Sequence, residues 1–309
     1  MKSRADIAHR RTAPFDHRGG QAARQRPYLR SPPISPRTIH NYFLRIAYDG
    51  TAYRGWQRQP GDLPTVQQTI EDLLSRVHHR TVTVGGCGRT DAGVHATQYY
   101  LHLRTEEPLP ANYHYFINKQ LPTDIALLEV LPVSDKAQAR YDATERTYDY
   151  FFHARPDAFL DRASALLPLT SFAPALSAQI LPLLLQHDRY RAFCKTPDRH
   201  NTTIVRFTEA TLFRNAAGDR FRLRFRANRF LRGMIRLLVN DLLMVGKGQL
   251  APADFKTMLE TGERKPHFRL APPEGLYLTG VAYPFIERGP ELPVTGREAW
   301  LKINENDAD

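Results

Sequence analysis

Cysteine is scarce in this 309-residue chain, which contains only Cys87 and Cys194. Two cysteines are too few for a disulfide scaffold, and these two lack the paired spacing of a zinc site. Long apolar runs are also missing: none approaches the ~20 residues of a membrane-spanning helix, and the first thirty residues lack the apolar core of a secretory signal. We therefore expect a soluble, cytoplasmic protein with reduced thiols and without a structural metal.

Acidic residues are outnumbered, with 32 Asp and Glu against 43 Lys and Arg and a net charge of +11. Such a charge attracts polyanions, including nucleic acids. Most of the excess lies in residues 1–38, where nine Lys or Arg residues stand against two Asp residues. This segment is rich in Arg, Pro and Ser and has no helical or strand period, so we predict a disordered basic tail. An organelle-targeting peptide and a nonspecific RNA-tethering arm both fit its composition, and we favour the arm.

Hydrophobic periodicity along the rest of the chain predicts an α+β protein. Strands are expected near 42–48, 81–84, 97–103, 125–131, 143–152, 204–213 and 220–227, and helices near 66–77, 111–119, 173–186 and 230–245, the last capped by Gly246. The order strand, helix, strand recurs in two halves, which predicts two similar lobes with mainly antiparallel sheets. We place the N-terminal lobe at 39–142, the C-terminal lobe at 143–285 and a C-terminal tail at 286–309.

A glycine-rich segment from Val84 to Ala96 contains the first candidate for chemistry, Asp91. The four glycines around it let a ligand approach the backbone, and Arg89 adds a fixed positive charge nearby. Asp91 can therefore be a nucleophile or base that faces an anionic substrate, or it can simply bind its own backbone in a turn. A phosphate-binding P-loop is excluded, because no Gly-Lys-Ser or Gly-Lys-Thr follows the glycines.

Arginines alternate with apolar residues over 220–227, so a strand there has one cationic face. Contact with nucleic-acid phosphates is favoured over an ordinary solvated face, with Arg222, Arg224, Arg226 and the nearby Arg229 as backbone contacts.

The helix that follows contains Arg236 among apolar residues. A buried guanidinium needs a carboxylate partner to offset the cost of leaving water, and Asp91 is a natural candidate.

Three further residues each have two interpretations. Tyr148 on a strand could stack on a base, although a core tyrosine is favoured on this signal alone. His95 could join Asp91 in a metal pair, but no third ligand follows at useful spacing, so a structural hydrogen bond is favoured. Cys87 has no His and acid arrangement around it, so packing is favoured over nucleophilic catalysis.

Together these motifs resemble the tRNA pseudouridine synthase A family over residues 42–283. The matching segments, in the order of the family, are Ala47–Thr51 with Gly55–Gln57, Gly88–Ala96, Ala139–Ala143 with Arg146–Tyr148, Arg229–Arg236 and Ala271–Leu276. The resemblance implies two ferredoxin-like lobes joined into one central sheet, with an active-site cleft between them, and a homodimer.

The resemblance also implies roles for individual residues. Asp91 would be the catalytic aspartate, Tyr148 would stack on the target base, Arg236 would pair with Asp91, and Arg89 would help to hold the flipped nucleotide. The implied reaction converts uridine to pseudouridine at positions 38, 39 and 40 of the tRNA anticodon stem-loop, without cofactor or metal. A noncatalytic tRNA-binding protein of the same fold is the alternative. A metal-dependent nuclease that uses Asp91 and His95 ranks below both.

Overall fold

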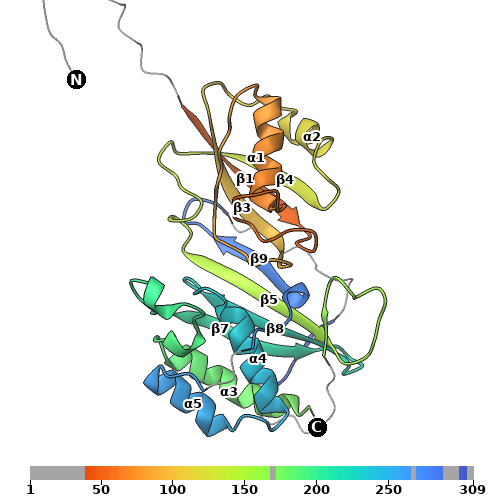
Figure 1. Ribbon diagram of the computed structural model, residues 1–309, viewed down its shortest axis with the longest axis vertical. Coiled ribbons are helices and arrows are strands. Elements are labelled where there is room, and N and C mark those ends of the chain that lie inside the picture. Colours follow the sequence, from red (N-terminus) through yellow and green to blue (C-terminus); the bar gives the residue numbers. More distant parts are fainter. Residues whose placement is uncertain (1–38, 168–171, 266–268, 288–298, 305–309) are drawn as a thin grey trace, which may run out of the picture. The chain divides into compact units, whose positions relative to one another are not determined.

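The computed structural model describes residues 39–167, 172–265, 269–287 and 299–304, so the tail predicted at residues 1–38 lies outside the described residues. The strands are β1 (His40–Tyr48), β2 (Gly85–Gly86), β3 (His95–Thr105), β4 (Ile125–Val133), β5 (Glu145–His153), β6 (Ala165–Leu166), β7 (Phe207–Arg214), β8 (Arg220–Ala227), β9 (Leu276–Ala282) and β10 (Leu301–Lys302). They form one mostly antiparallel sheet with the order β10-β7-β8-β5-β9-β3-β1-β4, and β2 and β6 are added beside β3 and β5 (Figure 1).

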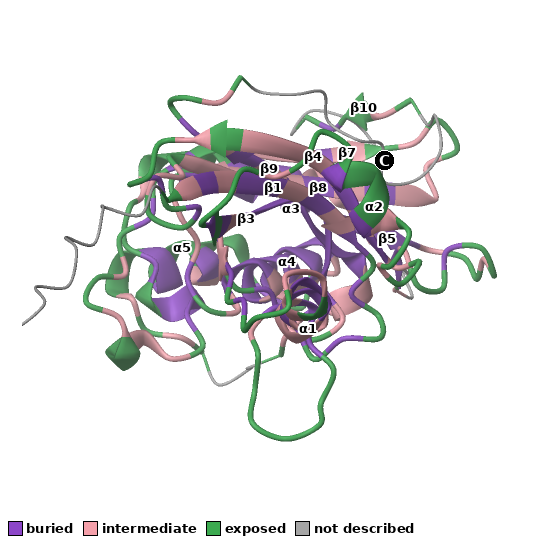
Figure 2. Ribbon diagram, turned by 90° about the horizontal axis from the view of Figure 1, so that it is seen from above, coloured by how far each residue is buried: buried purple, intermediate pink, exposed green. Residues whose placement is uncertain are grey.

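Helices cover one face of this sheet. They are α1 (Val66–Val77), α2 (Tyr113–Asn118), α3 (Pro174–Gln186), α4 (Met234–Gly246) and α5 (Pro252–Thr261), with short 3-10 segments at Arg191–Phe193, Pro197–Arg199 and Pro273–Gly275. Figure 2 shows α1, α4 and α5 on the same side of the sheet, and α3 packs against β7 and α4. Among the described residues, no helix has the length and apolar character needed to cross a membrane.

Two hydrophobic clusters lie between the helices and the sheet. One joins α1 to β1 and β3, and the other joins α3, α4 and α5 to β5, β7 and β8. The two halves of the sheet meet where β3 pairs in parallel with β9, at His95 with Tyr277 and Ala96 with Leu278. Tyr148 packs against both clusters. The α+β prediction, with two lobes sharing one central sheet, is confirmed, whereas the exact lobe boundaries stay a prediction.

Local signals predicted some elements to the residue. Helix α1 begins and ends as expected, and Thr65 caps it by accepting a hydrogen bond from the Gln68 amide (3.3 Å). The strand expected at 81–84 is wrong, because pairing with β3 involves Gly85–Gly86 instead.

The helix expected at 230–245 begins later, at Met234, because Gly233 takes a left-handed conformation (φ 69°) that interrupts it. Gly246 is the last residue of the helix, and the C-cap is Lys247 and not Gly246. The segment 286–309, predicted as a tail, contributes β10, which pairs with β7.

Candidate active site

Asp91 lies in the loop between β2 and β3, just before the junction of the two half-sheets. The loop is held by its backbone: the Trp56 amide donates to the Thr90 carbonyl (3.3 Å), and the Val94 amide closes a turn onto the Asp91 carbonyl (3.2 Å). Gly55 has φ 91°, and a Cβ there would lie 2.5 Å from the Thr90 oxygen, so only glycine fits beneath the loop. The Asp91 side chain remains 39% exposed, so it is open to a ligand.

Buried aromatic side chains pack beneath this loop and bind its backbone and side chains. Trp56 stacks on Tyr99 with ring centroids 4.0 Å apart. The Tyr99 hydroxyl donates to the Gly88 carbonyl (2.6 Å), and the Tyr48 hydroxyl bonds to the Thr90 hydroxyl (2.9 Å). The residues just before Asp91 are therefore fixed by buried side chains, which helps to preorganise the position of its carboxylate.

Arg236 forms the expected ion pair with Asp91. Its Nη1 lies 3.3 Å from Oδ2 of Asp91, and its Nε donates to the Ala271 carbonyl (2.6 Å). The Arg236 side chain is only 14% exposed, and the Ala271 amide donates back to the Arg236 carbonyl (3.0 Å). Because α4 begins at Met234, this arginine sits in the first turn of the helix, where α4 approaches the Asp91 loop.

Tyr148 on β5 projects to the helix-covered face of the sheet, where its ring contacts Phe230 edge to face (5.1 Å between centroids). Burial raises the pKa of Tyr148 above its ordinary value; the Cys87 thiol and Asp91 add to this rise, and Arg146 opposes it. Its phenol is therefore neutral at physiological pH. Arg236 contacts Asp91 directly, and Tyr148 lies near enough for the charge of Asp91 to raise the pKa of its hydroxyl.

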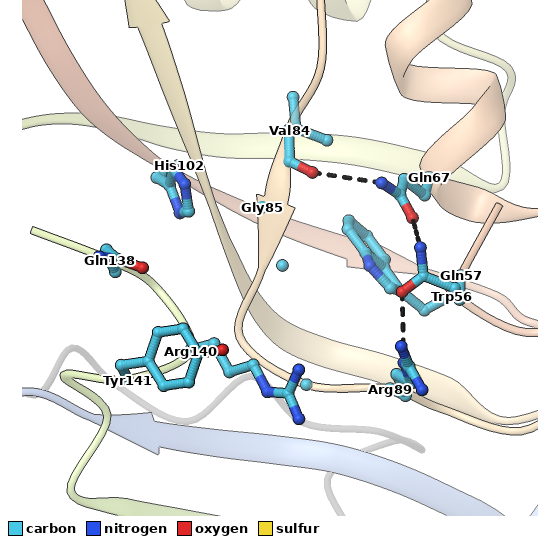
Figure 3. Close-up of a pocket in the computed structure, with 12 residues that line it drawn as sticks. Trp56, Gln57, Gln67, Val84, Gly85, Arg89, His102, Gln138, Arg140 and Tyr141 are labelled. Atoms are coloured by element: carbon cyan, nitrogen blue, oxygen red, sulfur yellow. Dashed lines mark hydrogen bonds between the residues drawn. The ribbon is translucent and has the colours of Figure 1, made fainter.

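Arg89, two residues before Asp91, is held by a different contact. Its Nε donates to Oε1 of Gln57 (3.3 Å), whose own amide donates to Oε1 of Gln67 (2.6 Å). Figure 3 shows Arg89 at the rim of a pocket that also includes Arg140 and Tyr141. The Arg89 guanidinium is exposed and can be reached by a bound polyanion.

The arginines of β8 are engaged with acids of neighbouring strands. Arg224 makes a two-pronged contact with Asp149 (2.8 and 2.9 Å), Nε of Arg222 lies 3.4 Å from the same carboxylate, and Arg226 pairs with one glutamate on β5 and one on β7. Because Asp149 alternates with Tyr148 along β5, these arginines occupy the sheet face opposite Tyr148. RNA contact by Arg222, Arg224 and Arg226 stays a prediction, and it would have to use that opposite face. Arg229 lies instead in the connection from β8 to α4.

Cys87 and His95 have structural environments. Burial raises the pKa of the Cys87 thiol to about 11, so the thiol is protonated at neutral pH. His95 accepts a hydrogen bond at Nδ1 from the Gly50 amide (3.1 Å) and stacks on Tyr277 (4.5 Å between centroids). The described part of the chain contains no group of three His, Cys, Asp or Glu residues arranged to hold a metal ion.

Arg146 has a positioning role that the sequence interpretation did not assign. Its guanidinium donates to four carbonyls, those of Cys87 (2.9 Å), Arg140 (2.8 Å), Ala143 (3.1 Å) and Asn228 (3.2 Å). It thereby ties the Asp91 loop to β5 and to the connection before α4. In the sequence, Arg146 stands in the family segment Arg146–Tyr148 and shares a strand face with aromatic residues, but neither signal predicts these contacts.

Known proteins resemble this chain over most of its length. The family model described as tRNA pseudouridine synthase matches residues 45–142 and 186–284. Proteins named tRNA pseudouridine synthase A are 39% identical in Chlorobaculum tepidum (81% of this chain, 99% of the relative) and 37% identical in Exiguobacterium sibiricum (81% and 100%). The Porphyromonas gingivalis protein of the same name is 36% identical over 79% of this chain and 97% of its own. The chain therefore belongs to the tRNA pseudouridine synthase family of isomerases.

Proposed function

We propose that this protein converts uridine to pseudouridine at positions 38, 39 and 40 of the tRNA anticodon stem-loop, with Asp91 as nucleophile. The observation that supports this most strongly is the grouping of Asp91, Arg236 and Tyr148 in one site of a chain that belongs to this family. We further propose that it acts in the cytoplasm as a homodimer, as the family resemblance implies.

The reaction breaks the bond from N1 of uracil to C1′ of ribose and joins C5 to C1′, while C5 loses its proton and N1 gains one. The Asp91 carboxylate is exposed enough to reach a substrate, and it could attack C1′, add to C6 or remove the 2′ proton. Arg236 holds the carboxylate in one orientation during any of these steps.

The target uridine must leave its stack to reach Asp91. Tyr148 offers a neutral aromatic ring beside the carboxylate, which can replace the lost stacking on the base. Arg89 is exposed at the rim, where it can brace the vacated space. We keep backbone contact as the proposed role of Arg229 and, on the opposite sheet face, of Arg222, Arg224 and Arg226.

Substitution of Asp91 by Asn tests the assignment. Asparagine preserves the shape of the side chain and can still accept a hydrogen bond from Arg236, so fold and tRNA affinity should change little. Pseudouridine formation, followed by mapping in tRNA and by tritium release from C5-labelled uridine, should be abolished. Retained turnover would contradict the role of Asp91.

The wild-type protein separates the competing functions. A noncatalytic tRNA-binding protein of the same fold would bind tRNA without tritium release, and a nuclease would cleave RNA in a chelator-sensitive way. Mapping pseudouridines in tRNA made with and without this protein identifies the positions.

A further inference from the structure

A pocket of about 230 Å³ opens beside the Asp91 loop and is not part of the Asp91, Arg236 and Tyr148 group. Trp56 and Gln57 line one part of it, and His102, Arg140 and Tyr141 line another (Figure 3). The glycines that precede Asp91 form the wall between them. The Cβ position of Gly88 has nothing within 4 Å, so the wall borders open space at Gly88, whereas Gly85 and Gly86 pack closely against His102, Tyr99 and Trp56.

Two cations border the pocket. Arg89 and Arg140 both line it, and no ion pair joins either of them to a carboxylate among the described residues. The arginines of β8 are different, because glutamate and aspartate side chains already surround them. Positive charge that lacks a carboxylate partner suits a phosphate group.

The polar groups of the pocket are held in place by the protein itself. Gln67, which donates to the buried Glu71 (2.9 Å), positions Gln57, and Gln57 in turn positions Arg89. His102 accepts a hydrogen bond at Nδ1 from the Ala139 amide (3.3 Å). Burial lowers the pKa of His102, so the ring is neutral and its proton lies on Nε2, a donor in the pocket wall.

Tyr141 adds a stacking surface. Its side chain is 74% exposed, which is unusual for a large aromatic residue, and the Arg140 guanidinium lies 5.6 Å from the ring centroid. An exposed aromatic ring beside unpaired cations is the combination that binds single-stranded nucleotides, because the ring stacks on the base and the cations bind the backbone.

We infer that this pocket binds a second nucleotide of the RNA substrate, one that is not modified, with its base on Tyr141 and its phosphate between Arg89 and Arg140. The inference rests on the proposed function, because it takes RNA as the substrate. It adds a contact through which the protein holds the loop while another nucleotide occupies the Asp91 site. Arg89 lies between the two sites and would touch both nucleotides.

The test pairs protein variants with altered RNA. Anticodon stem-loop RNAs in which one unmodified nucleotide at a time lacks its base are bound to the full-length wild-type protein and to the Tyr141→Ala variant. Loss of a base that stacks on an aromatic ring weakens binding by about tenfold. At one RNA position, removal of the base should weaken binding to the wild type by about this factor. The same removal should not weaken binding to Tyr141→Ala any further. Tyr141→Phe should behave like the wild type.

Tyr115 provides a matched control. It is also an exposed tyrosine (62%) with a cation, Lys119, over its ring (4.4 Å), but it lies on α2 outside the pocket. Tyr115→Ala should leave the effect of every missing base unchanged. The inference would be overturned if the effects of Tyr141→Ala and of a missing base on binding were additive at every RNA position. It would also be overturned if Tyr115→Ala were coupled to a missing base as strongly as Tyr141→Ala is.

Pseudouridine formation by the wild type is measured in parallel. Turnover together with additive binding effects rejects the pocket inference alone. Binding with the expected coupling but without turnover rejects only the proposed catalysis. An absence of RNA binding rejects both.

Discussion

At the scale of single residues, the contact that defines the site is the pair of Asp91 and Arg236. The Ala271 carbonyl holds Nε of Arg236 (2.6 Å) independently of Asp91, so the guanidinium is already oriented before a substrate arrives. Fixed charges that need no reorganisation during the reaction are an effective way to stabilise a transition state. The geometry therefore gives Arg236 a role in orienting the carboxylate and not only in balancing its charge.

Substitution of Arg236 by Lys should lower kcat by at least about tenfold while the Kd for tRNA changes little. Lysine keeps the charge, but its single ammonium group cannot reproduce the forked geometry that reaches Ala271 and Asp91 together. Single-turnover kinetics at saturating tRNA would measure the effect. Arg232→Lys, a change at an exposed residue just before α4, is the matched control, and an equal loss of kcat in both variants would contradict the role of Arg236.

The thiol of Cys87 should resist alkylation in the native protein. With a pKa of about 11, roughly one thiol in a thousand is ionised at pH 8, and the fraction rises as the pH increases. Iodoacetamide at pH 8 should therefore leave the Cys87 peptide unmodified unless the protein is first unfolded, as mass spectrometry would show. The same treatment should not reduce activity. Rapid labelling of the folded protein would contradict this environment for Cys87.

At the scale of elements, the sequence predicted those features that depend on neighbouring residues better than those that depend on contacts between distant segments. The capping residue Thr65 and an apolar helical period lie within α1 itself, so its limits followed from its own residues. The start of α4 did not, because the left-handed Gly233 lies against Lys195 and Leu270, which come from distant segments. The sequence also did not predict the ion-pair partner of Arg224. Asp149 precedes it by 75 residues, and the two meet only because β5 pairs with β8. Within the candidate site, the family motifs predicted Asp91, Tyr148 and Arg236, and the structure contains the pair of Asp91 and Arg236, whereas the four contacts of Arg146 required the folded chain.

Substitutions of Arg224 on β8 and of Arg229 in the connection that follows β8 should differ in their effect on stability. Asp149 is 1% exposed, so Arg224→Met leaves a buried carboxylate with weaker compensation. The free energy of unfolding should fall by about 2–4 kcal/mol. Arg229→Met, by contrast, should preserve stability and reduce the slope of log affinity against log salt by about one, as expected for one lost phosphate contact.

Urea unfolding and tRNA titrations at several salt concentrations would measure both effects. Because backbone contact is also proposed for Arg224, its variant should reduce the salt slope as well, and an unchanged slope would contradict RNA contact by β8.

At the scale of the whole molecule, the site depends on both halves of the chain. Asp91 comes from the first half and Arg236 and Tyr148 from the second, and the sheet joins the halves through only two parallel residue pairs between β3 and β9. The stacked rings of His95 and Tyr277 lie at this junction. Changes that loosen the junction are therefore expected to separate the Asp91 loop from its partners before they unfold either hydrophobic cluster.

The basic segment 1–38 should act on affinity and not on chemistry. Its nine Lys or Arg residues can release counterions from RNA, and each phosphate contact contributes about 0.7–0.9 to the salt slope. If about half of them contact RNA, removal of the segment should lower the slope by about three and weaken tRNA binding at low salt, while kcat at saturating tRNA stays unchanged. A variant with these basic residues replaced by serine keeps the length of the segment and should behave like the deletion. An unchanged salt slope in both variants would contradict the RNA-tethering role and favour a targeting peptide.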